Sequence, residues 1–191
     1  MLGTPIPILA IQILSIDLIA EILPLTALTF DPASEHLMKS PPRKQDEHIV
    51  NKRSFSEIIF LALLMGGLAF INFYLFINEQ TATVREGTQL YARGTTISFL
   101  TIAFSQWVNI MSRRYEYKSI FNKNFFSNTK MIYSIIISIG MVLLVIYSPI
   151  NSFLGFAGVS LADWIRVVLA GGIFLLGHEV IKFFKRKNES V

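Results

Sequence analysis

The sequence lacks cysteine, and it lacks charge over long stretches. Because none of its 191 residues is Cys, a disulfide framework and a thiolate metal site are both excluded. Residues 58–77, 94–112 and 131–162 are uncharged, and residues 1–30 carry no basic residue. A secretory signal peptide begins with a basic region, so we expect that residues 1–30 are not one.

What the sequence has instead is apolar surface gathered in long blocks. Hydrophobic residues make up 52% of the chain, which includes 16 Phe, and the mean hydropathy is +0.52. About 20 apolar residues cross the hydrocarbon core of a bilayer as a helix. A soluble bundle would need a polar face on each helix, and these blocks have none. We therefore predict an all-α, polytopic transmembrane bundle of about five spans, at approximately 7–29, 56–77, 94–112, 130–148 and 161–182.

The positive charges lie at the ends of these blocks. The net charge is +4, and Lys and Arg gather in the connections 31–53 and 113–130 and after residue 182. This is the distribution of the positive-inside rule, so we do not expect nucleic acid as a partner. We predict a multi-pass protein of the plasma membrane in contact with lipid. Its N-terminus would lie outside and its C-terminus in the cytoplasm.

The first block contains two carboxylates, Asp17 and Glu21, and no other charge between residues 1 and 30. An ionised carboxylate in hydrocarbon costs at least about 2.5 kcal/mol. Their i, i+4 spacing places both on one helical face. We expect this face to point to a protein interior, where the pair binds a cation or is protonated. Pro24 removes a backbone hydrogen bond nearby, and the freed carbonyl is either a cation ligand or the mark of a simple kink.

Amide side chains form a second candidate set. Gln106 and Asn109 lie at i, i+3 in the block 94–112, and such amides either hold helices together or bind a ligand. With Asp17 and Glu21 they would offer hard oxygen ligands, which suit Na⁺, Ca²⁺, Mg²⁺ or K⁺.

For five other polar residues we favour structural roles. Asn72 should form an interhelical hydrogen bond, and Glu57 should be solvated. His178, Glu179 and Lys182 are interpreted as a polar cluster with an ion pair, with a cation site as the less favoured alternative.

Four motifs make the sequence similar to one family. The run QILSIDLIAEILPLTALTFDP from Gln12 to Pro32, followed by MKSPPR, resembles helix six and the next loop of P-type cation-transporting ATPases. SQWVNIMSRR, which begins at Ser105, resembles helix eight, and HEVIKFFKRK, which begins at His178, resembles the end of helix ten. The resemblance covers essentially residues 1–191, as helices six to ten of a calcium or sodium/potassium pump-like protein.

The resemblance also implies a set of site residues. Asp17 and Glu21 match the ligand positions of helix six, and Gln106 and Asn109 match those of helix eight. Two positions depart from the family pattern. Ala20 stands where these pumps carry Thr, and Asn109 replaces an acidic residue of the sodium/potassium pumps, so the cation is left open.

The catalytic motifs of that family are absent. The sequence contains no D-K-T-G phosphorylation motif, no T-G-E-S loop, no G-D-G hinge and no P-E-G-L-P break of helix four. We therefore expect no catalytic and no cofactor-binding residue in this chain, and no ATP hydrolysis by the chain alone. ATP and Mg²⁺ would bind in the missing domains, and the partners would be helices one to five and the cytoplasmic domains. The alternative is a stand-alone membrane interaction protein without transport.

Overall fold

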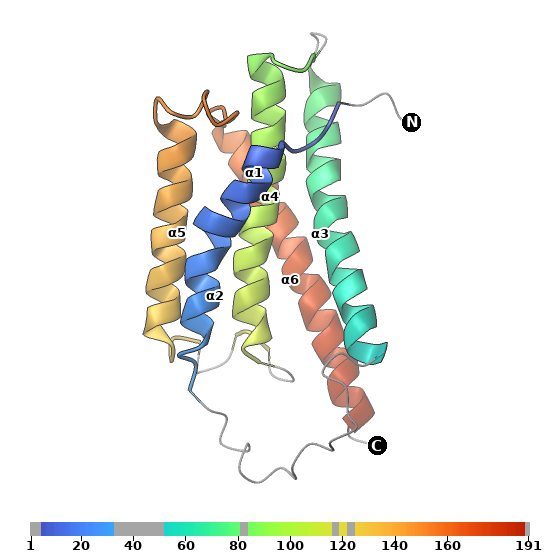
Figure 1. Cartoon of the computed structure of the whole chain (residues 1–191). Helices are drawn as coiled ribbons and strands as arrows, with labels where there is room; N and C mark the ends of the chain where they lie inside the picture. Colours follow the sequence, from blue (N-terminus) through green and yellow to red (C-terminus); the bar gives the residue numbers. More distant parts are fainter. Residues whose placement is uncertain (1–4, 33–51, 81–83, 116–118, 122–124, 190–191) are drawn as a thin grey trace.

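The computed structural model describes residues 5–32, 52–80, 84–115, 119–121 and 125–189, and the regular elements in these ranges are all helical (Figure 1). The first span is built from three consecutive pieces: α1 (Ala10–Ser15), the wider π-helical turn η1 (Ile16–Glu21) and α2 (Ile22–Leu28). The other helices are α3 (Lys52–Glu79), α4 (Gln89–Arg113), α5 (Thr129–Tyr147) and α6 (Leu161–Glu189). The predicted all-α fold class is confirmed, and α6 continues beyond the predicted end at residue 182.

Successive spans run in opposite directions, and α4 lies at the centre of the bundle (Figure 1). It packs against α3, α6 and the first span, while α5 packs against the first span from the other side. Four of the spans are long and apolar enough to cross a membrane: Ala10–Leu28, Ser54–Glu79, Thr129–Tyr147 and Leu161–Lys187.

The central helix α4 is not among those four, because it is more polar. Its hydroxyl side chains are nonetheless buried: Thr95, Thr96, Thr101 and Ser105 are all 0% exposed. They face other helices rather than lipid. Thr95, Thr96 and Thr101 bond to the backbone of α4 or to neighbouring segments, whereas Ser105 Oγ has no hydrogen-bond partner among the described residues. The predicted span 94–112 is therefore a helix of this bundle. It can be more polar than the other spans because its polar side chains are buried against other helices.

The outer surface of the bundle is apolar. Leu63 of α3, Leu144 of α5 and Leu176 of α6 are between 63% and 71% exposed. An extended apolar surface of this kind marks a membrane contact. Together with the four apolar helices, it identifies an integral membrane protein.

A polar cluster fixes the lower end of the first span in Figure 1. Asn128 caps α5 by accepting from the Met131 N–H at 3.0 Å, and its amide donates to the Ala27 carbonyl and to Asp31 at 3.1 Å each. Arg114, whose side chain is 1% exposed, pairs with the same Asp31 carboxylate at 2.8 Å. The cluster thereby ties the end of α2 to the start of α5 and the end of α4.

Parts of the predicted basic connections lie outside the described residues. This holds for most of the connection 31–53, with the motif that begins at Met38, and for Lys118 and Lys123.

Candidate cation site

The first span is interrupted at the candidate carboxylates. In η1 the Ile22 N–H bonds to the Asp17 carbonyl, five residues back, instead of four. Pro24 has no N–H, so the Ala20 carbonyl loses its usual helical partner. The indole Nε1–H of Trp107 donates to this carbonyl at 2.8 Å. Two roles were predicted for the freed carbonyl: a cation ligand, or a simple kink of the helix. Because the Ala20 oxygen accepts a hydrogen bond from Trp107 of α4, the structure favours the simple kink.

Above this break, Gln12 fixes the span. Its side chain is fully buried, and its Nε2 donates to Thr95 Oγ1 at 3.0 Å and to the Gly155 carbonyl at 2.9 Å. Its Oε1 accepts from the Leu9 N–H at 3.1 Å. Gly155 has φ +71°, a conformation that strains any residue with a side chain, and a Cβ there would lie 2.6 Å from Leu9 Cδ1. No structural role was predicted for Gln12, because two of its three partners, Thr95 and Gly155, are remote in the chain.

Below the break, a row of polar side chains begins at Glu21. The Gln106 Nε2 donates to Glu21 Oε2 at 3.3 Å, and the Asn109 Nδ2 donates to Gln106 Oε1 at 3.2 Å. The Asn109 Oδ1 accepts from Arg113 Nε at 3.3 Å and lies 3.1 Å from His178 Nε2. Three of the four predicted site residues are thus brought together, and α4 and the end of η1 hold them.

Asp17 lies elsewhere. It is exposed on the described bundle, whereas Glu21 is half-buried. The reason is that η1 packs through Ile16 and Ala20, which are 6% and 0% exposed. Within the described bundle Asp17 therefore does not face the interior. Whether the rest of a pump covers it is not tested by this chain, so the expectation stays a prediction.

The donor set at this place is small. Within the described ranges, no group of three or more His, Cys, Asp or Glu could hold a metal ion. The row offers carboxylate and amide oxygens only. Since Ca²⁺ takes 6–8 oxygen ligands, these residues could form part of such a shell but not all of it.

The structural roles predicted for other polar residues have mixed outcomes. The interhelical bond of Asn72 is confirmed, because its Nδ2 donates to Thr101 Oγ1 at 2.9 Å. The Glu179–Lys182 ion pair is present at 3.6 Å. Glu57 was expected to be solvated, and this is wrong: it pairs with Lys185 at 2.8 Å, and its side chain is 16% exposed.

Comparison with known proteins identifies the family. The family model described as "Cation transporting ATPase, C-terminus" matches residues 5–184. The chain belongs to this family. The resemblance noted in the sequence is confirmed, and the bundle is the C-terminal membrane domain of a cation-transporting P-type ATPase.

Individual relatives of this ATPase domain are calcium pumps by name. The chain is 30% identical to "Calcium-transporting ATPase 1" of Bacillus cereus, over 97% of this chain and 22% of the relative. It is 27% identical to "Calcium-transporting ATPase" of Bacillus subtilis, over 95% and 20%. It is 30% identical to "Calcium-transporting ATPase type 2C member 2" of Rattus norvegicus, over 95% and 19%. The chain spans about a fifth of the length of these curated relatives.

Proposed function

We propose that this ATPase domain takes part in ATP-driven Ca²⁺ transport, and that Asp17, Glu21, Gln106 and Asn109 contribute to the cation site. The names of the relatives support Ca²⁺ as the cation. Carboxylate and amide oxygens support a hard cation in general. In this proposal ATP and Mg²⁺ bind in other parts of the pump, which also supply helices one to five. The membrane is the plasma membrane, and the C-terminus lies in the cytoplasm.

One observation carries the proposal: a carboxylate inside a span meets a row of amides at a π-helical turn. Glu21 is half-buried, and its described partner, Gln106 at 3.3 Å, is neutral. A carboxylate within a membrane segment is expensive and by default indicates function. A single turn of π-helix inside an α-helix is frequent at functional sites.

The hydrogen bonds also indicate what cation binding requires. Gln106 presents its N–H side to Glu21 and its oxygen to Asn109. A cation at Glu21 needs oxygen ligands, so the Gln106 amide would rotate to turn Oε1 toward it. Asn109 already uses Oδ1 to accept from the positive Arg113. The cation therefore lies nearer Glu21 than Asn109, and Asn109 acts mainly by orienting Gln106.

Asp17 would complete the carboxylate pair from the exposed side of η1. Two nearby carboxylates are difficult to ionise together unless a cation neutralises them. In a complete pump we expect the remaining helices to cover Asp17 and to supply the other oxygen ligands. Cation release would then be coupled to proton uptake by the pair.

The test is Ca²⁺-activated phosphoenzyme formation in a pump assembled from this chain and the remaining part of the Bacillus cereus relative. Glu21→Ala should weaken the apparent Ca²⁺ affinity most, because it removes a charged ligand. Asp17→Asn should weaken it less, because the amide keeps one oxygen, and Gln106→Ala should have the smallest effect. Thr26→Ala, an exposed position on α2, is the control. Unchanged Ca²⁺ affinity in all three variants would contradict the site.

A further inference from the structure

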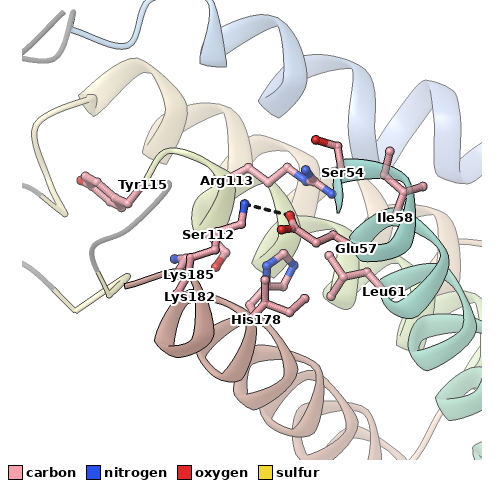
Figure 2. Close-up of a pocket in the computed structure, with 11 residues that line it drawn as sticks. Ser54, Glu57, Ile58, Leu61, Ser112, Arg113, Tyr115, His178, Lys182 and Lys185 are labelled. Carbon is pink, nitrogen blue, oxygen red and sulfur yellow. Dashed lines mark ion pairs between the residues drawn. The ribbon is translucent and has the colours of Figure 1, made fainter. Parts of the chain in front are cut away.

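A second polar site lies between α3, α4 and α6, near the end of the bundle where the distribution of Lys and Arg predicts the cytoplasm. It is a pocket of about 250 Å³. Figure 2 shows the side chains of Arg113, Lys182 and Lys185 around it, with Glu57 on the facing helix. The pocket is distinct from Glu21 and Gln106, which do not line it. The pocket lies next to the polar row formed by Glu21, Gln106 and Asn109, because His178 both lines the pocket and contacts Asn109.

The charges of these residues do not cancel. Glu57 pairs with Lys185 at 2.8 Å, so this carboxylate is neutralised. Glu179 lies 3.6 Å from Lys182. Among Arg113, Lys182, Lys185, Glu57 and Glu179 there are three cations and two carboxylates, which leaves one positive charge in excess. Each carboxylate pairs with a lysine, so the excess charge is that of Arg113, which is exposed at the edge of the pocket.

Two donors in the pocket are buried without a hydrogen bond. The Lys182 side chain is 5% exposed, and within the described part of the chain its Nζ has no hydrogen-bond partner, since the Glu179 oxygen at 3.6 Å is too far. An ammonium group carries three donors. Ser112 Oγ, in the wall formed by α4, is also buried without a partner. Unbonded buried donors are costly, so both indicate a ligand that accepts hydrogen bonds.

We propose that this pocket binds a phosphate group, held by Lys182 and Ser112 with Arg113 at the edge. A phosphate has several acceptor oxygens and a negative charge, so one group satisfies both donors and offsets the excess charge. Lys and Arg are the usual phosphate-binding side chains. Basic pockets between transmembrane helices at the cytoplasmic side bind anionic lipid headgroups. The wall also contains Ile58, Leu61 and Ile181, which would suit the glycerol and first methylenes of a lipid.

The experiment uses the full chain purified in mild detergent. Native mass spectrometry with added 1-palmitoyl-2-oleoyl phosphatidic acid should show one tightly retained lipid per chain. Diacylglycerol with the same acyl chains, which lacks the phosphate, should be retained at least tenfold less. Titration with inorganic phosphate, followed by ³¹P line broadening, separates the two sources. Saturable binding of either phosphate source supports the pocket, and competition between them indicates one shared site.

Two substitutions connect the binding to the pocket. Lys182→Met keeps the stem but removes the charge, and should weaken phosphate-dependent binding at least tenfold. Lys130→Met removes one charge at the same end of the bundle, beside the Phe30 ring and away from the pocket, and should change binding less than twofold. If Lys182→Met does not fold, Ser112→Ala is decisive, with an expected loss of about threefold. Equal binding by Lys130→Met and the pocket variants, or no saturable binding of either phosphate source, would overturn the proposal.

Discussion

The two halves of the first span use buried polar groups differently. Above the π-helical turn, Gln12 is 0% exposed and forms three hydrogen bonds of 2.9–3.1 Å to groups held by two other segments and its own helix start. Below it, Glu21 is half-buried and its row consists of longer bonds, 3.3 Å to Gln106 and 3.2 Å between Gln106 and Asn109. In the upper half, the buried amide of Gln12 has hydrogen-bond partners for its oxygen and its nitrogen, and these bonds hold the span in place. The lower half keeps a carboxylate and two amides in longer hydrogen bonds, which agrees with the proposed cation site.

The largest effect on stability should come from Gln12. Gln12→Ala leaves the Leu9 N–H and the Gly155 carbonyl without their partner, so we expect the free energy of unfolding to fall by about 2–3 kcal/mol. Glu21→Ala should not lower it, because it removes a charge from a membrane segment. Thermal unfolding of the full chain in detergent, followed by circular dichroism, measures both. If Glu21→Ala is as unstable as Gln12→Ala, then Glu21 also has a structural role, and the two halves of the span do not differ in the way proposed.

A smaller effect should follow at the turn that separates them. Trp107→Phe keeps an aromatic ring but leaves the Ala20 carbonyl unbonded, at a cost of about 1–2 kcal/mol. Trp164→Phe is the matched control. It removes an indole N–H that donates to Tyr147 Oη at 2.9 Å in an exposed place, so water can replace it. If both variants have the same free energy of unfolding, the hydrogen bond from Trp107 to the Ala20 carbonyl does not stabilise the interrupted helix.

The sequence predicted the helices well because their signals are local. Each predicted span became a helix. The structure shows why α5 ends where it does: Asn128 caps its start, and Ser148, the residue before Pro149, follows its end. Gln106 and Asn109 lie together because i, i+3 spacing fixes a face within a helix. Glu21 joins them from another helix, 85 residues away in the sequence, which spacing within one helix does not determine.

Several other contacts between remote residues were not predicted, since no periodicity connects them. Trp107 and Ala20 are 87 residues apart in the sequence, and Gln12 and Gly155 are 143 apart. The Glu57–Lys185 pair was missed for the same reason. Helical spacing places Asp17 and Glu21 on one face, but it does not tell which neighbours that face meets, so the difference in exposure between the two carboxylates could not be predicted.

Glu21 and Gln106 are proposed to act together on one cation. A double-mutant cycle of Glu21→Ala and Gln106→Ala, read as apparent Ca²⁺ affinity for phosphoenzyme formation in the assembled pump, tests this. Residues that share one ligand are not additive, with coupling of about 0.5–3 kcal/mol. We predict that the double variant loses less affinity than the sum of the single losses, whereas Glu21→Ala combined with Thr26→Ala is additive. Additive losses for Glu21 and Gln106 would contradict a shared site.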